Sequence, residues 1–292
     1  MRKRNYIKRI ALTVISLIAL AIAAIYIWST AILDKTYHVP LTEVHIPTDS
    51  ASIIEGARLT QIEHCSDCHG DHLTGAVFAK RDHVAEFVAP DITKIIPTYS
   101  NEELERLLRY GVEKNGHSVY IMPADMYHQL KEESLVKIIA YLRTLHPLPP
   151  TQGIPLRTSY DFLGRLKLIE DKIRPIASLI KPNSPRLYIP HDTTQASFGK
   201  YLVMTTCTVC HGKDLKGEEG VTPDLIIAAA YKKEEFFKLI RTGVALGDRK
   251  NIGMMSYVAK NYLSYLSDKE INSIYAYLKT KPTTEPHQIA KK

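Results

Sequence analysis

The hydrophobic pattern of the chain begins with one long run that carries no charge. Residues 10–33 form 24 consecutive positions without a charged side chain. A helix of that length spans about 36 Å, and the hydrocarbon core of a bilayer is about 30 Å thick. The run therefore predicts a transmembrane helix, with residues 1–33 as a membrane anchor that crosses once.

A cleaved signal peptide is the alternative for this segment. Ser29-Thr30-Ala31 is an acceptable small-residue cleavage site, but the apolar region of a signal peptide usually has only about 7–15 residues. The single tryptophan, Trp28, and Tyr26 lie at the outer end of the run, where amphipathic rings favour the membrane interface. We expect an anchor that is retained.

The rest of the chain carries apolar residues at helical spacing, and it carries them twice. A middle helix in each copy has three apolar positions at i, i+3 and i+4. A last helix in each copy adds the position i+7, and the two stripes are displaced by 136 residues. The positions are Leu104, Leu107 and Leu108 with Phe236, Leu239 and Ile240, then Leu135, Ile138, Ile139 and Leu142 with Ile271, Ile274, Tyr275 and Leu278.

Local signals mark the ends of the middle helices. Ser100 followed by Glu103 predicts a capping box, and Gly111 and Gly243 stand where a helix C-terminus is expected. No run in either copy alternates convincingly as a strand. The sequence therefore predicts an all-α chain, with two tandem domains at 50–148 and 191–285 after the transmembrane helix.

Proline marks the connection between the two domains. Residues 147–190 hold eight of the 16 prolines, and this density is typical of a linker, which we place at 149–190. Between Phe162 and Ile180, apolar residues alternate with arginines and lysines. This pattern favours a short helix that packs on a domain, and a helix on the membrane surface is the alternative.

The net charge of +7 comes mainly from the N-terminus. Five basic residues precede the apolar run, and without them 38 − 5 = 33 basic residues face 31 acidic ones, which leaves +2. Lysines and arginines next to a membrane span mark its cytoplasmic side. The charge thus predicts a protein of the inner membrane with its domains on the periplasmic or outer side, and it gives no support to nucleic-acid binding.

The four cysteines form two pairs, and each pair precedes a histidine. The spacing Cys-x-x-Cys-His is a haem-attachment signal, in which two thiols bind the porphyrin covalently and the histidine binds the iron. A redox dithiol, a zinc site and two disulfides are the alternatives. Two copies at equivalent places, with no cysteine left over, favour two covalent haem c groups. The residues are Cys65, Cys68 and His69, and Cys207, Cys210 and His211.

A second axial ligand is sought in each copy among methionines and histidines. In the second copy no histidine lies between His211 and His287, and the methionines there are Met254 and Met255. We favour Met255 because of the Ser-Tyr-Val that follows it. Methionine and histidine together raise the reduction potential and close the coordination sphere, which suits electron transfer.

The first copy offers more candidates for this ligand. Met122 is followed by Pro123 and lies 133 residues before Met255, the same displacement that relates the two Pro-Asp pairs at Pro90 and Pro223. We therefore favour Met122 as the ligand of the first iron. The rivals are Met126, His83, His117 and His128.

The two proline carbonyls are candidates for a supporting role. An iron-bound histidine needs an acceptor for its other ring nitrogen. We hypothesise that the carbonyls of Pro90 and Pro223 are these acceptors, because each follows its motif in a loop.

At these motifs the chain resembles the class I cytochrome c domain family, twice over. More narrowly it is similar to the multihaem cytochrome subunits that serve periplasmic alcohol and sugar dehydrogenases, through the stretch Ala89-Pro90-Asp91-Ile92-Thr93 and Met122-Pro123. Such subunits usually have three haems, and this chain has two motifs. The resemblance implies the class I fold and electron transfer. The expected redox partner is a dehydrogenase, a quinol-linked complex or a terminal oxidase.

Two enzymatic functions compete with that of a non-catalytic electron carrier. A dihaem peroxidase needs one iron with a free position, whereas both copies offer a methionine. A dihaem enzyme of thiosulfate oxidation uses a cysteine ligand, whereas all four cysteines are assigned to the two attachment motifs. We therefore expect an electron carrier, with the peroxidase as the alternative.

Overall fold

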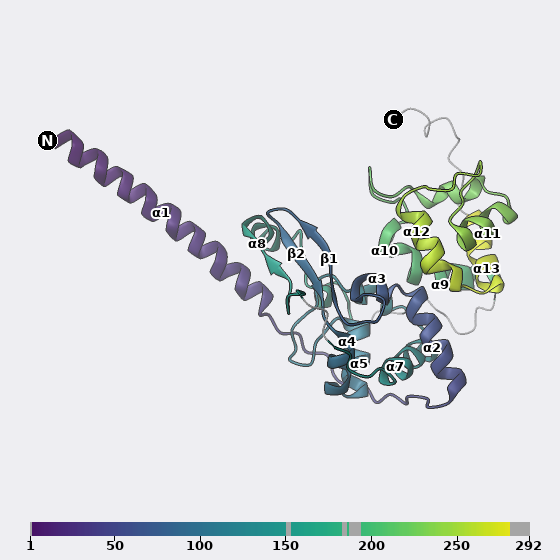
Figure 1. The fold of residues 1–292 in the computed structure, drawn as a ribbon. Helices are drawn as coiled ribbons and strands as arrows, with labels where there is room; N and C mark the ends of the chain where they lie inside the picture. The colour runs from purple at the N-terminus through teal and green to yellow at the C-terminus, as the bar shows by residue number, and fades with distance from the viewer. Residues whose placement is uncertain (1, 150–152, 183–185, 187–193, 281–292) are drawn as a thin grey trace.

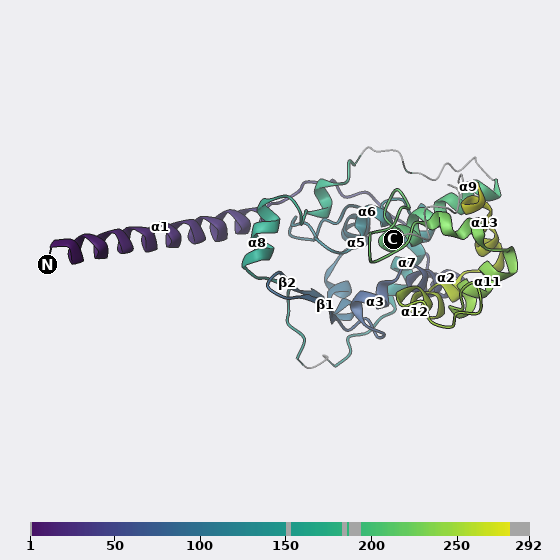
Figure 2. The same cartoon turned by 90° about the horizontal axis from the view of Figure 1, so that it is seen from above.

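The computed structural model describes residues 2–149, 153–182, 186 and 194–280. Helix α1 (Arg2–Leu33) extends away from the rest of the chain, and two helical domains follow it (Figures 1 and 2). Within the described residues, α1 is the one helix that is long and apolar enough to cross a membrane. Parts of the predicted linker (150–152, 183–185 and 187–190) and of the second predicted domain (191–193 and 281–285) lie outside the described residues.

The first domain contains seven helical segments and a small sheet. Its helices are α2 (Ser50–Ile62), α3 (Cys65–His69), α4 (Ile92–Ile95), the 3₁₀ turn Ile96–Thr98, α5 (Asn101–Tyr110), α6 (Ala124–Tyr127) and α7 (Glu132–Arg143). Strands β1 (Ala76–Arg81) and β2 (Ala85–Ala89) form a hairpin between α3 and α4.

The second domain repeats this order of helices. It consists of α9 (Gln195–Leu202), a π-helical turn (Val203–Cys207), α10 (Thr208–His211), the 3₁₀ segment Leu225–Ala230, α11 (Lys233–Thr242), α12 (Met254–Asn261), the 3₁₀ turn Leu263–Tyr265 and α13 (Asp268–Lys279). The middle and last helices are therefore confirmed in both copies. The capping box of Ser100 with Glu103 and the left-handed glycines Gly111 and Gly243 are confirmed as well.

The first and last helices of each domain cross at a glycine. A Cβ atom on Gly56 of α2 would lie 1.9 Å from the carbonyl oxygen of Lys137 in α7, and one on Gly199 of α9 would lie 1.8 Å from that of Ser273 in α13. Backbone stands against backbone at both crossings, so no side chain fits there. The predicted apolar stripes of α7 and α13 are buried at these crossings.

An arginine closes each domain in the same way. In the first domain the Arg109 guanidinium donates to the carbonyl of Leu130 and pairs with Glu132. In the second domain Arg241 donates to the carbonyl of Leu266 and pairs with Asp268. Each arginine ties the middle helix to the start of the last helix, so the repeat extends to polar contacts.

The sheet departs from the prediction of a chain without strands. The interval from His69 to Pro90 is 21 residues and that from His211 to Pro223 is 12, and the nine extra residues supply most of the β1–β2 hairpin. A bulge between Val77 and Ala79 interrupts the register, so the alternation expected of a strand is lost. The fold is mostly helical, with this one small sheet in the described residues.

Much of the predicted linker packs on the first domain. Strand β3 (Ser159–Tyr160) adds to the edge of β2, and α8 (Phe162–Ile169) follows it. Gly164 of α8 faces the carbonyl of Val84, and Leu168 is buried. The expectation of a short helix that packs on a domain is confirmed for α8.

At the Gly199 crossing, helix propensity and packing predict opposite changes in the free energy of unfolding when glycine is replaced by alanine. Alanine stabilises a helix interior by about 1 kcal/mol relative to glycine, but the Cβ of Gly199→Ala would overlap the Ser273 carbonyl. We expect a net loss of about 1–3 kcal/mol in the free energy of unfolding, measured by urea unfolding of the holoprotein. Lys200→Ala, at the exposed neighbouring position, should change it by less than about 0.5 kcal/mol. A stabilised Gly199→Ala variant would contradict the crossing.

Candidate haem-attachment sites

The first Cys-x-x-Cys-His motif forms a single short helix. Helix α3 begins after His64, whose φ of 60° is left-handed, and ends at Gly70 with φ 77°. The amide of Gly75 donates to the carbonyl of His69 over 2.9 Å. The Nδ1 of His69 lies 2.8 Å from the carbonyl oxygen of Pro90 and donates to it. The Nε2 of His69 is therefore the nitrogen left to bind a metal.

The second motif has the same local geometry. Cys207 ends the π-helical turn, and α10 carries the remaining residues up to Gly212, with φ 71°. The amide of Gly217 donates to His211 over 2.9 Å. The Nδ1 of His211 lies 2.8 Å from the carbonyl oxygen of Pro223. Both proline contacts that the sequence suggested are thus present.

The loops after the two histidines begin in the same way. Leu73 and Leu215 both adopt a positive φ, which is unusual for leucine. The carbonyl of Leu73 accepts from Ile92, and that of Leu215 accepts from Leu225, at 2.9 and 2.8 Å. These bonds fix the loop that brings each proline carbonyl to its histidine.

The state of the cysteines argues against the other uses of these motifs. All four are free thiols, so neither pair forms a disulfide. Burial is the main cause that raises the pKa of Cys65 and of Cys207 to about 12, whereas a reactive dithiol needs a lowered pKa. Among the described residues, no group of three or more His, Cys, Asp or Glu side chains is placed to hold a metal.

Each preferred methionine lies against the apolar core beside a motif cysteine. Met122 packs on the first core cluster together with Cys65, and Met255 packs on the second together with Cys207. Met254 is 64 % exposed, which favours Met255 over its neighbour. The donor set of each domain, two thiols, one oriented imidazole and one thioether, fits a covalently attached haem.

The rival ligands of the first domain occupy other surroundings. Met126 is buried within α6. His83 is exposed at the hairpin turn, and His117 bridges to Thr36 of the segment after α1. His128 is buried with its ring against that of Tyr110. The choice of Met122 over these residues stays a prediction.

Comparison with known proteins finds one cytochrome family model on each domain. The family model "Cytochrome c" matches residues 53–146. The model "Cytochrome C oxidase, cbb3-type, subunit III" matches residues 194–278. Each range contains one attachment motif, its proline and its methionine. The chain belongs to the cytochrome c family. Haem binding and electron transfer follow from that membership.

Relatives of this cytochrome are subunits of dehydrogenases. It is 26 % identical over 263 residues to the fructose dehydrogenase cytochrome subunit of Gluconobacter japonicus, covering 79 % of this chain and 53 % of that protein. It is 23 % identical over 280 residues to the cytochrome c subunit of the alcohol dehydrogenase (quinone) of Gluconacetobacter polyoxogenes, covering 82 % and 58 %. The cytochrome thus spans between half and three fifths of the length of the curated relatives it matches.

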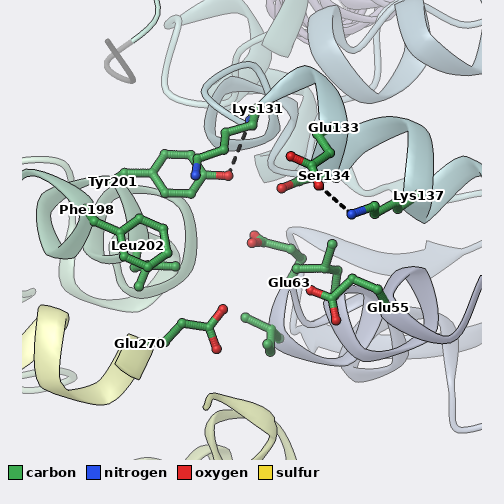
Figure 3. A pocket seen from close by; sticks show the side chains of 12 residues that line it. Glu55, Glu63, Lys131, Glu133, Ser134, Lys137, Phe198, Tyr201, Leu202 and Glu270 are labelled. Carbon is green, nitrogen blue, oxygen red and sulfur yellow. Dashed lines mark hydrogen bonds and ion pairs between the residues drawn. The ribbon is translucent and has the colours of Figure 1, made fainter. Parts of the chain in front are cut away.

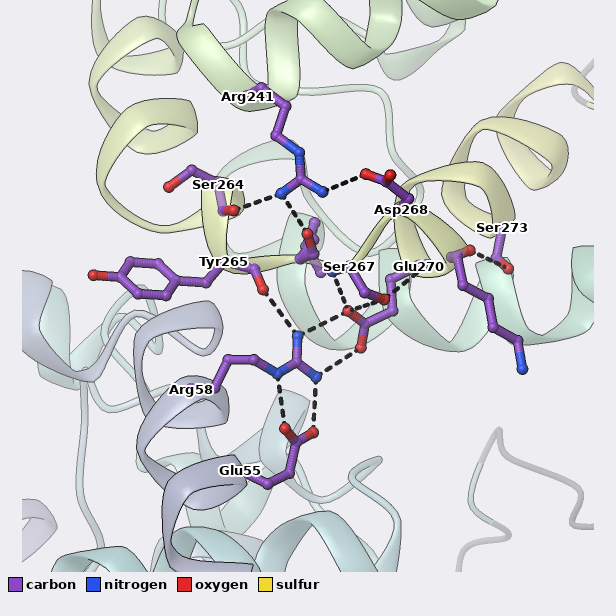
Figure 4. A network of polar contacts seen from close by, with 11 residues as sticks. Glu55, Arg58, Arg241, Ser264, Tyr265, Ser267, Asp268, Glu270 and Ser273 are labelled. Atoms are coloured by element: carbon purple, nitrogen blue, oxygen red, sulfur yellow. Dashed lines mark hydrogen bonds and ion pairs between the residues drawn. The ribbon is translucent and has the colours of Figure 1, made fainter. Parts of the chain in front are cut away.

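An arginine from the first domain joins the two domains of the cytochrome (Figure 4). Arg58 of α2 pairs with Glu55 on its own helix and with Glu270 of α13, both at 2.8 Å. It also donates to the carbonyl of Tyr265 over 2.9 Å. Four residues further on, Ile62 is 1 % exposed and lies within the apolar core of the second domain.

This docking places the two motifs next to each other. The Tyr262 hydroxyl of the second domain donates to Asp67, inside the first motif, over 3.2 Å. The ring of His64 lies edge-on to that of Tyr262, with centroids 4.8 Å apart. Burial lowers the pKa of His64 to about 4, so this ring is neutral at neutral pH. The ring of His64 also hydrogen-bonds to the backbone of Thr206, the residue before Cys207.

A cavity of about 150 Å³ lies at the same interface (Figure 3). Its lining includes Glu63 from the first domain, and Tyr201 and Glu270 from the second. Glu63 is 5 % exposed, and its Oε2 has no hydrogen-bond partner among the described residues. Burial, and then the charge of Glu270, raise the pKa of Glu63 well above its usual value. Nothing in the sequence marks Arg58, Glu63 or Glu270, because their partners lie in the other domain.

Glu63 gives the cytochrome a predictable pH dependence. A carboxyl with a raised pKa holds its proton more tightly in the folded state, so stability falls as pH rises above about 4.5, by up to about 1.4 kcal/mol per pH unit. Glu63→Gln removes this loss. We expect the variant and the wild type to unfold alike near pH 4 in urea, and the variant to be the more stable at pH 8. The exposed control Glu219→Gln should follow the wild type, and equal stability of Glu63→Gln and wild type at pH 8 would refute the assignment.

Proposed function

We propose that this cytochrome carries two haem c groups and transfers electrons without being an enzyme itself. The observation that carries the proposal is the repeated donor set, in which each motif histidine is oriented by a proline carbonyl at 2.8 Å. The proposed attachment residues are Cys65, Cys68, Cys207 and Cys210, and the proposed iron ligands are His69, Met122, His211 and Met255. When bound, haem c supplies a one-electron redox centre.

The residues around each proposed site position the proposed iron ligands and take no chemical part in a reaction. The Nδ1–H bond from each histidine to its proline carbonyl fixes the ring and strengthens Nε2 as a ligand. Met122 and Met255 are half-buried and pack against the apolar clusters of their domains. A site closed on both faces favours electron transfer over the peroxidase alternative, which needs an open position.

The docked domains support transfer within one chain. Contacts of His64 and Asp67 with Tyr262 hold the first motif against the second domain. The neutral ring of His64 and the buried Ile62 keep this contact dry. We infer that an electron can pass between the two sites without release from the protein.

We infer that the electron donor is a dehydrogenase and that the acceptor lies in or at the inner membrane. The named relatives are cytochrome subunits of fructose and alcohol dehydrogenases, and α1 provides the proposed single span with the domains on the periplasmic side. The second domain lies on the side of the first domain away from α1 (Figure 1). It is therefore the domain open to a donor in solution. A dehydrogenase that co-purifies with the cytochrome from solubilised membranes would support this donor, and a co-purifying oxidase or quinol complex alone would replace it.

Axial ligation tests the carrier against the peroxidase. In the wild type we expect a weak charge-transfer band at the red edge of the visible spectrum from both ferric haems, and no binding of carbon monoxide by the ferrous protein. Met255→Leu should remove half of the band and open one haem to carbon monoxide, and Met122→Leu should do the same for the other. Met254→Leu and Met126→Leu are the matched controls and should leave both spectra unchanged. Binding of carbon monoxide by the wild type would favour the peroxidase instead.

A further inference from the structure

Helix α8 is held against the outer end of α1 (Figures 1 and 2). The guanidinium of Arg165 lies over the ring of Tyr26, 4.4 Å from its centroid. Its Nη1 donates to Ser29 Oγ at 2.9 Å and to Thr30 Oγ1 at 3.1 Å. Ser29 is fully buried by this contact. The position of α8 along the axis of α1 is therefore fixed by specific bonds.

The contact lies at the depth where the membrane ends. Thr30 lies 20 positions after Ile10, where the uncharged run begins, and a helix covers this interval in about 30 Å. This length equals the thickness of a hydrocarbon core. If the run begins at the inner boundary, Tyr26 to Thr30 occupy the last few ångströms of the outer leaflet. Helix α8 then lies at the outer lipid boundary.

One side of α8 packs on the first domain, and another side is exposed. Gly164 and Leu168 face the first domain. Phe162 and Leu163 are adjacent in the chain and are 40 % and 45 % exposed. The domain beneath the helix leaves these two side chains uncovered.

The positive side chains of α8 are of the kind found at a lipid headgroup layer. The helix contains Arg165 and Lys167 and no acidic residue. Arg165 is held by α1, and the acidic residues that follow the helix, Glu170 and Asp171, pair with Lys172 and Arg174. Within the described residues Lys167 forms no ion pair. Long cationic side chains at a membrane boundary extend their charge toward lipid phosphates while their stems stay in apolar contact.

We propose that α8 is an interfacial helix that lies in the outer headgroup layer of the phospholipid membrane, with Phe162 and Leu163 inserted at the acyl boundary. The partner is the lipid surface itself, and its phosphates face Lys167, while Arg165 holds the helix to α1. The inference rests on the proposed membrane span of α1. Together, α1 and α8 would hold the first domain in one orientation on the membrane and keep the second domain distal.

Spin labels on the full-length holoprotein test the depth of α8. The four native cysteines are the only ones in the chain and are assigned to thioethers, so one introduced cysteine can be labelled alone. Leu163→Cys is compared with Ile18→Cys in the middle of α1 and with Val221→Cys on the second domain, positions that are 45 %, 55 % and 70 % exposed. The protein is placed in vesicles of phosphatidylethanolamine and phosphatidylglycerol. The ratio of oxygen to water-soluble nickel accessibility reports the depth of each nitroxide.

We expect this ratio at residue 163 to be several-fold higher than at residue 221 and lower than at residue 18. A label at Phe162→Cys should give the same intermediate depth, and it covers the case in which Leu163→Cys disturbs the helix. An aqueous ratio at residues 162 and 163 beside a deep ratio at residue 18 would overturn the proposal and leave the span intact. An aqueous ratio at residue 18 would overturn the span and the proposal together.

Discussion

The arrangement of this cytochrome depends on one guanidinium that is shared between its two domains. Arg58 pairs with Glu55 on its own helix and with Glu270 on the last helix of the other domain, 212 residues away. An ion pair at such an interface costs desolvation energy, and the loss of one partner leaves the other charge unpaired. The pair therefore specifies one docking geometry. Ile62, one helical turn further on, supplies the apolar burial that accompanies it.

The function follows from what this docking brings together. Within each domain, a glycine crossing lets the first and last helices touch, and a loop with one left-handed leucine returns a proline carbonyl to the motif histidine. The docking held by Arg58 brings His64, next to the first motif, into contact with Tyr262 of the second domain. The charge of one buried carboxyl, Glu63, contributes to the raised pKa of Cys65 and of Cys207. Two local sites thereby become one unit.

Sequence patterns predicted the local elements of the fold but not the contacts between the two domains. The motifs, the capping box at Ser100 and the stripes of α7 and α13 depend on neighbours a few residues apart, and such patterns are readable. The hairpin was missed because a bulge at Val77 breaks its alternation. The contacts of Arg58 and Glu63 were missed because each side of the interface looks like an ordinary charged helix surface until the other domain is placed on it.

The same limit applies to the ligands. The second domain offered two adjacent methionines, and exposure of Met254 separates them only in three dimensions. In the first domain Met122 and Met126 lie on either side of one helix start; Met126 is buried and Met122 is half-buried. Spacing relative to the second copy is the signal that distinguishes them.

The central claim is that two haem-bearing domains are docked in a fixed geometry. Pulsed electron paramagnetic resonance on the fully oxidised holoprotein measures the distance between two ferric haems directly. A docked pair predicts one narrow distance distribution in detergent and in vesicles alike. A broad distribution, or the absence of any dipolar coupling between two haems, would contradict the account.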